Sequence, residues 1–200
     1  MTSSITSIIF DFGNVFVRWD ARTLYRRFFP TLDVDSFFKE IHFSEWNAHQ
    51  DAGRSFSEGI AELSSQFPHF AEYIRAYDTY WEESISETYI GTIKIAAELK
   101  DAGYELYLLS NFSAEKFPLM RKRYGFLQLF NDMIISGEHK LIKPEPAIFH
   151  LTLSRINRKA EECLFIDDSL ANINTARSLG FNTVHFHSPE QLKHDLQNIL

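Results

Sequence analysis

The stretch "SIIFDFGNVFVRWD" at residues 7–20 decides the fold, because an apolar run is followed at once by a carboxylate, a glycine and an asparagine. The run at 7–10 is rich in β-branched and aromatic side chains, which predicts a buried strand. Asp11 then stands at the carboxyl end of that strand, where open parallel sheets bind their ligands. The role of Asp11 therefore depends on what the other strand ends bring to the same edge.

Four further runs predict strands, the last of them the weakest: 105–110, 132–136, 163–166 and 183–186. Helical patterns lie between these runs, and three of them stop at a glycine: about 89–102, 113–124, 145–156 and 169–179. Strands that alternate with helices predict an α/β fold with a Rossmann-like parallel sheet covered on both faces.

Residues 17–88 break this rhythm, because they hold helical patterns but no convincing strand. The stretch is too long for a loop, since structureless connections rarely exceed roughly 15 residues. We therefore predict a small helical unit inserted after the first strand. The predicted division is a core of 1–15 and 89–200 with a helical cap of 16–88.

Composition excludes several classes of protein. A chain of 200 residues, 44% of them hydrophobic, can bury one core and a smaller unit. The net charge of −7 and the scattered basic residues argue against nucleic acid as a partner. No apolar run reaches the roughly 18 residues of a membrane span, and the N-terminus has no basic signal region. With Cys163 as the single cysteine, we expect a cytoplasmic monomer or small homo-oligomer.

The residues that follow the apolar runs should converge on one crevice. They are Asp11, Ser110, Asn111, Lys143, Asp167 and Asp168. Carboxylates brought together repel one another unless a cation lies among them, and oxygen ligands suit Mg²⁺. A cation beside a lysine, a hydroxyl and an amide is well suited to a phosphoryl group. Alone, each residue is as readily explained as a helix cap, a turn or an exposed charge; their joint occurrence predicts phosphoryl transfer through an aspartyl-phosphate.

Four segments carry a resemblance to a known family: "IIFDFGNV", "LLSN", "KPEPAIF" and "LFIDDSLANINTARSLG". In this order and separation they resemble the four motifs of the haloacid dehalogenase-like (HAD) hydrolase superfamily. The resemblance covers essentially the whole chain, and the helical insert resembles the C1-type cap of that superfamily. It implies a HAD-like core with a cap that closes over the site and chooses the substrate, a small phosphorylated metabolite.

The resemblance also implies roles for individual residues. Asp11 would be the nucleophile and a ligand of Mg²⁺, and Gly13 would offer its backbone carbonyl to the ion. Asp168 would bind Mg²⁺ directly, and Asp167 directly or through water. The remaining motif residues would hold the phosphate and steady the nucleophile: Ser110 with Asn111 for the phosphate, and Lys143 for both.

One position departs from the pattern. Phosphatases of the superfamily that this chain resembles usually have a second aspartate two residues after the nucleophile, which acts as general acid and base. In this chain that position is Gly13. The form "DxGNV" resembles bacterial sugar-1-phosphate phosphatases, including glucose-1-phosphate phosphatase-like proteins. An anomeric phosphate is a comparatively good leaving group, so the acid is either dispensable or replaced from the cap. Candidates for a replacement are Asp20, His49 and Asp51.

Three other classes compete with a phosphatase. A 2-haloacid dehalogenase also lacks the second aspartate, because a halide needs no proton, but its first motif usually has an aromatic residue where this chain has Gly13. A receiver domain gathers similar residues, but in another order and without a long insert. A catalytically silent binding protein would have had no reason to keep Asp11, Lys143, Asp167 and Asp168 together.

Overall fold

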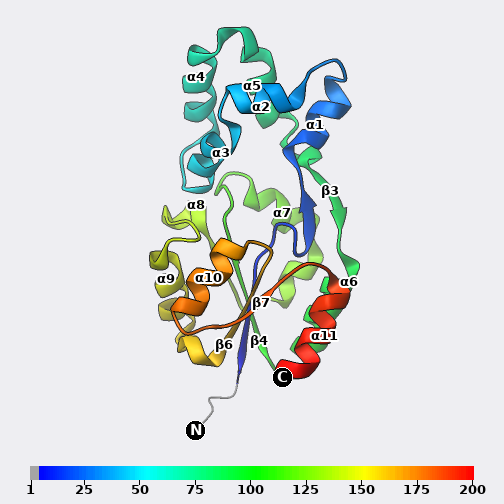
Figure 1. Ribbon diagram of the computed structural model, residues 1–200, viewed down its shortest axis with the longest axis vertical. Coiled ribbons are helices and arrows are strands. Elements are labelled where there is room, and N and C mark those ends of the chain that lie inside the picture. Colours follow the sequence, from blue (N-terminus) through cyan, green and yellow to red (C-terminus); the bar gives the residue numbers. More distant parts are fainter. Residues whose placement is uncertain (1–4) are drawn as a thin grey trace.

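A parallel five-stranded sheet forms the centre of the computed structural model, which describes residues 5–200 (Figure 1). Its strands are β1 (Ser7–Phe10), β4 (Glu105–Ser110), β5 (Asp132–Ile135), β6 (Cys163–Asp167) and β7 (Asn182–His185). The strand order is β5-β4-β1-β6-β7, and Ile8 of β1 is in register with Leu106 and Leu164 of its neighbours. The α/β prediction and all five predicted strands are confirmed.

Helices cover both faces of the sheet. One face carries α6 (Ile90–Asp101), α7 (Phe117–Arg123) and α11 (Pro189–Ile199), whose apolar residues pack with Ile8 and Phe10. The other face carries α9 (Pro146–Ile156) and α10 (Leu170–Ser178), which pack with Ile9, and a short helix, α8 (Ser136–His139), follows β5. Because successive side chains of a strand point to opposite faces, the continuous apolar run of β1 supplies both clusters.

Helix α11 was not predicted from the sequence, although its segment begins with recognisable signals. Ser188 is the N-cap, its hydroxyl accepts a hydrogen bond from the backbone of Gln191, and Pro189 occupies the first turn. These are ordinary start signals of a helix.

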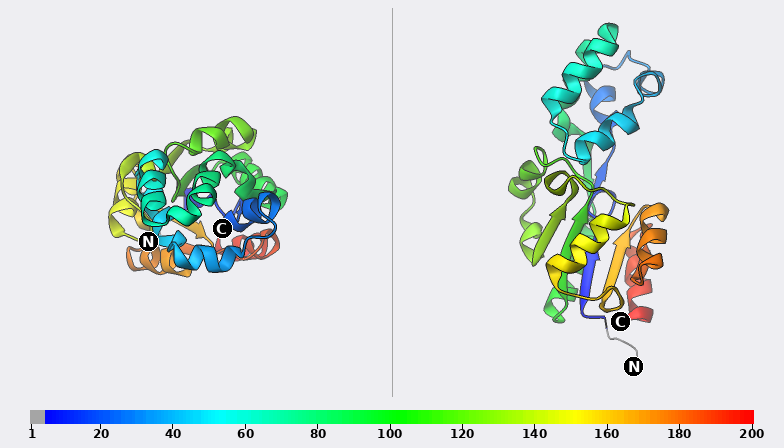
Figure 2. Two further views of the ribbon diagram at one scale, coloured as in Figure 1. Left: turned by 90° about the horizontal axis from the view of Figure 1, so that it is seen from above. Right: turned by 90° about the vertical axis from the view of Figure 1, so that its left-hand side faces the viewer.

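The insert, residues 16–88, is mostly helical and lies over the carboxyl ends of the strands (Figures 1 and 2). Its helices are α1 (Ala21–Phe28), α2 (Val34–Glu40), α3 (Phe43–Asp51), α4 (Phe56–Gln66) and α5 (Ala71–Thr79). Three of them begin at capped residues, Asp20, Asp33 and Ser55, and Ser55 completes a capping box with Glu58.

The prediction that residues 17–88 contain no strand was wrong. Strands β2 (Val17–Trp19) and β3 (Ile85–Thr88) pair antiparallel at the two ends of the insert. Each is short and mixes polar with apolar side chains, so neither produces the continuous apolar run of a buried strand. Together they form the two-stranded connection between the insert and the sheet (Figure 1).

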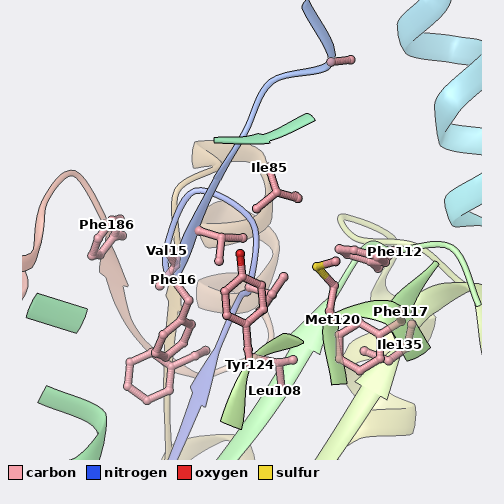
Figure 3. Close-up of a cluster of buried hydrophobic side chains, with 14 of the residues drawn as sticks. Val15, Phe16, Ile85, Leu108, Phe112, Phe117, Met120, Tyr124, Ile135 and Phe186 are labelled. Atoms are coloured by element: carbon pink, nitrogen blue, oxygen red, sulfur yellow. The ribbon is translucent and has the colours of Figure 1, made fainter. Parts of the chain in front are cut away.

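A single apolar cluster joins the insert to the sheet. Figure 3 shows Ile85 of β3 in the same cluster as Leu108 of β4 and Ile135 of β5. Trp81 and Phe112 continue this contact, with their ring centroids 5.3 Å apart. The insert is therefore attached by packing as well as by its two strands.

Within the described residues, none of the helices combines the length and apolar character that crossing a bilayer requires.

Phe16, at the start of the insert, offers a test of this packing. It is fully buried, and its ring lies 5.1 to 5.6 Å from those of Phe10, Phe126 and Phe130. Phe16→Ala should lower the free energy of unfolding by about 3–5 kcal/mol in urea titrations, because it leaves a large cavity. The matched control is Phe28→Ala, which removes a ring that is 37% exposed and should cost less than about 1 kcal/mol. An equal decrease in the free energy of unfolding for the two variants would contradict the packing described between the insert and the sheet.

Candidate active site

Three aspartates meet at the carboxyl ends of β1 and β6. Asp11 follows β1, Asp167 ends β6 and Asp168 comes next, and carboxylate oxygens of the three lie within 4.8 Å of one another. The parallel pairing of β1 with β6 brings their ends to one edge and so causes this approach. The convergence expected from the sequence is confirmed for these residues.

Lys143 contacts two of the aspartates, Asp11 and Asp167, and is almost completely buried. Its Nζ is 3.0 Å from Asp11 Oδ1 and 2.6 Å from Asp167 Oδ2, and it also donates to the carbonyl of Leu109 at 2.9 Å. Burial by itself lowers the pKa of Lys143, but Asp11 and Asp167 outweigh this effect, so the pKa is raised above its usual value. Lys143 is therefore charged at neutral pH.

Two of the three carboxylates have a raised pKa. Burial is the main cause for Asp11, and with the charges of Asp167 and Asp168 it outweighs Lys143 and raises the pKa of Asp11 to about 7. Burial, followed by the charge of Asp167, also raises the pKa of Asp168. Three carboxylates against one ammonium leave a site that attracts cations.

Ser110 and Asn111 follow β4 at the same edge, but their environments differ. Ser110 is buried and lines the cavity described below. The Asn111 amide is paired with the backbone of Lys143: its Nδ2 donates to the Lys143 carbonyl and its Oδ1 accepts from the Lys143 N–H, both at 2.8 Å. Asn111 therefore anchors the loop that carries Lys143.

Two asparagines that the sequence analysis did not single out hold the acidic residues in place. Asn172 Nδ2 donates to both oxygens of Asp167 at 3.0 Å, and Asn14 Nδ2 donates to Asp168 Oδ2 at 3.1 Å. Asn14 has a positive φ of 55°, a conformation that asparagine adopts more readily than most residues. The position of Asn14 directly after Gly13 was the sequence signal that it belongs to the site. For Asn172 the only signal was its position about one helical turn after the two aspartates.

A cavity of about 160 Å³ lies between the core and the insert, above Asp11. From the core it is lined by strand-end residues that include Asp11, Gly13, Asn14, Ser110 and Asp168. From the insert it is lined mainly by aromatic rings and a few polar groups: Trp19, Phe56, Tyr77, Trp81, Asn47 and Asp51. None of the described residues that line it is a lysine, arginine or histidine.

Of the three candidates for a replacement acid, only Asp51 lines this cavity. Asp20 caps α1 and lies within 4.0 Å of Arg22 and Arg26. His49 is on α3 but exposed to solvent. The insert therefore brings one of the three to the site.

Asp51 is half-buried at the end of α3, in surroundings with little charge. Burial is the main cause that raises its pKa to about 7, with Asp11 adding to the effect and the backbone N–H of Ser113 opposing it. Its Oδ2 accepts a hydrogen bond from Asn47 at 3.0 Å, and among the residues in the structure no basic nitrogen lies within ion-pair distance of it.

The comparisons with known proteins place the chain in a class of hydrolases. Residues 5–180 match the model of the haloacid dehalogenase-like hydrolase family, so the chain belongs to this family. It is 27% identical over 98% of its length to drimenol cyclase of Aspergillus calidoustus, of which it spans 36%. It is 22% identical over 92% of its length to a sesquiterpene phosphatase of Aspergillus oryzae, of which it spans 91%.

Solved structures share the whole fold, insert included. A HAD family enzyme of Bacteroides thetaiotaomicron has a TM-score of 0.79 at 20% identity, with 96% of this chain and 98% of that one covered. The same enzyme has been solved with magnesium and inorganic phosphate, with a TM-score of 0.74 at 22% identity over the same shares of the two chains.

The raised pKa of Asp51 should make the free energy of unfolding depend on pH. Below about pH 4 it is protonated in both states, and between about 4 and 7 only the unfolded chain releases the proton, so the folded state loses stability as the pH rises. Asp51→Asn removes this loss and should raise the free energy of unfolding by about 1–2 kcal/mol at pH 8, with little change at pH 4. Urea titrations at both pH values measure it, and a variant that is less stable at pH 8 would contradict the assigned environment.

Proposed function

We propose that this protein is a Mg²⁺-dependent phosphatase that hydrolyses a small phosphomonoester through an aspartyl-phosphate on Asp11. The observation that carries the proposal is the buried Lys143, held by Asp11 and Asp167 under an open cavity that Asp168 also lines. A carboxylate attacks a phosphate dianion only if their mutual repulsion is screened, and Lys143 supplies part of that screening. Membership of the hydrolase family and the sesquiterpene phosphatase relative agree with this reaction.

The donor set fits a hard cation. Asp11 accepts its hydrogen bonds through Oδ1 and Asp168 through Oδ2, so each has a second oxygen to offer, and Gly13 could add its backbone carbonyl. Both oxygens of Asp167 already accept N–H groups from Lys143, Ser169 or Asn172, which favours contact through water. When bound, Mg²⁺ would neutralise charge on the phosphate.

Each remaining residue has a task that its contacts support. Asp11 would attack phosphorus, and Ser110 would hold a phosphate oxygen. Lys143 would keep Asp11 oriented and favour its ionised form, and Asn111 would keep Lys143 in place through its two hydrogen bonds to the Lys143 backbone. The insert, which we propose as the cap over residues 16–88, would exclude bulk water from the cavity.

The cavity lining favours an ester with an uncharged leaving group. Its charged members are Asp11, Asp51 and Asp168, all carboxylates, so a substrate with a second anionic group would meet repulsion. The aromatic rings of Trp19, Tyr77 and Trp81 offer apolar surface to a sugar ring or another carbon skeleton. A sugar-1-phosphate fits this description, and so does the class of substrate named by the sesquiterpene phosphatase.

The same lining argues against the alternatives. A 2-haloacid carries a carboxylate, and no basic side chain lines the described cavity to receive it. A silent binding protein would have no need of a lysine buried between the nucleophile and a second carboxylate, because such a pair is costly to bury. A receiver domain would have no use for an insert that encloses the site.

The first test is phosphate release from p-nitrophenyl phosphate and a set of sugar phosphates. Wild type should release phosphate with Mg²⁺ and not with EDTA, and Asp11→Asn should lower kcat/KM at least about a thousandfold, because the amide is no nucleophile. Asp35→Asn, at an exposed carboxylate of α2 that does not line the cavity, is the matched control. Release that survives both EDTA and Asp11→Asn would overturn the proposed reaction.

The second test concerns the charge of the leaving group. Alkyl and sugar phosphates with neutral leaving groups should have kcat/KM values at least about tenfold above those of phosphoglycolate, whose carboxylate would face Asp51 and Asp168. Steady-state kinetics at one ionic strength measure the ratio. A preference for phosphoglycolate would contradict the inferred substrate class.

A further inference from the structure

Position 13 leaves the proposed reaction without its usual proton donor. An alkoxide is a poor leaving group, and its departure from phosphorus is helped by a group that gives it a proton. Neither Gly13 nor Asn14 can donate a proton and take it back, and the Nδ2 and Oδ1 of Asn14 are already bonded to Asp168 and Trp19. A group with this ability must come from elsewhere in the cavity.

Asp51 lines the cavity from the insert side and is held in a fixed orientation. Asn47, one turn earlier on α3, donates to Asp51 Oδ2 at 3.0 Å, and the Asn47 Oδ1 in turn accepts the hydroxyl of Tyr77 at 3.0 Å. The backbone carbonyl of Asp51 accepts the Ser136 hydroxyl of α8, which ties this end of α3 to the core. The carboxyl is therefore placed by the insert and the core together.

The charge surroundings of Asp51 suit a group that changes its protonation state. Asp51 lines the cavity, and among the described residues no lysine or arginine is paired with it. Burial and the neighbouring acid Asp11 favour the protonated form, so the raised pKa of about 7 agrees with a group that gives and takes a proton near neutrality. The remaining described carboxylates of the cavity, Asp11 and Asp168, have roles at phosphorus and at the cation.

We propose that Asp51 is the general acid and base of this site, supplied by the insert in place of the residue missing at position 13. The inference depends on the proposed phosphatase function. As Asp11 forms its bond to phosphorus and the ester P–O bond breaks, the Asp51 carboxyl gives its proton to the leaving oxygen, which departs as an alcohol. The Asp51 carboxylate then takes a proton from the water that attacks phosphorus, the Asp11–phosphorus bond breaks, and both residues return to their starting states.

The test compares leaving groups in wild type and Asp51→Asn. The variant should lose about a hundredfold or more in kcat/KM on an alkyl phosphate and less than about tenfold on p-nitrophenyl phosphate, whose leaving group needs no proton. With p-nitrophenyl phosphate the variant should also accumulate phosphorylated protein, detected by intact mass after rapid quenching, because the water step lacks its base. The control Asp35→Asn, at an exposed carboxylate of α2, should stay within about twofold of wild type on both substrates.

Two results would overturn the role of Asp51. One is Asp51→Asn activity within about threefold of wild type on the alkyl phosphate; the other is an equal loss on both substrates with no phosphorylated protein, which a merely structural role would produce. Should the variant fail to fold, wild type alone decides: kcat/KM across esters of different leaving-group pKa should vary weakly if an acid assists, and a steep dependence would overturn the proposal. Wild type that releases no phosphate from any ester would instead overturn the phosphatase function itself.

An aspartate placed at position 13 should restore the activity that Asp51→Asn loses. A Cβ atom on Gly13 would meet no other atom within 4 Å, so Gly13→Asp is sterically allowed. The double variant Asp51→Asn/Gly13→Asp should recover at least about tenfold in kcat/KM on the alkyl phosphate over Asp51→Asn alone, because it returns a carboxyl group to the cavity. Such recovery separates a proton-transfer role from a structural one.

Discussion

The buried contact of Lys143 with Asp11 and Asp167 is the interaction on which the site depends. Carboxylates at the ends of neighbouring strands repel one another, and the ammonium between them reduces that repulsion. An ammonium removed from water is stable only when its donors are satisfied, and here the third goes to the carbonyl of Leu109. Asn111 fixes the loop that delivers Lys143, and Asn172 fixes Asp167.

This contact does not balance the charge of the site. Asp11 has a pKa of about 7, and that of Asp168 is also raised, because burial and the neighbouring carboxylates outweigh one lysine. A cation between Asp11 and Asp168 would relieve this imbalance and favour the ionised form of the nucleophile. The repulsion among acids gathered at one edge thus favours binding of the cation that the proposed reaction needs.

The insert completes the site by supplying what the sheet edge lacks. The core brings carboxylates, a hydroxyl and an amide to the cavity, while the insert brings aromatic surface and Asp51. The continuous apolar cluster through Phe12, Phe112 and Trp81 holds the two sides together. A proton donor on the insert would act only while the insert covers the core, which would couple proton transfer to the exclusion of water.

The sequence by itself determined the core and most of the edge at which the acidic residues meet. The four apolar runs that end at Asp11, Ser110, the loop before Lys143 and Asp167 specify a parallel sheet, and parallel strands align their carboxyl ends whatever lies between them. It could not reveal β2, β3 or the roles of Asn14 and Asn172, since short strands and single amides leave no periodic signal. Nor could it choose among Asp20, His49 and Asp51, because the packing of the insert against the core decides which side chain reaches the cavity. Only the tertiary structure decided that choice, by placing Asp51 at the end of α3 against α8 and the loop after β4.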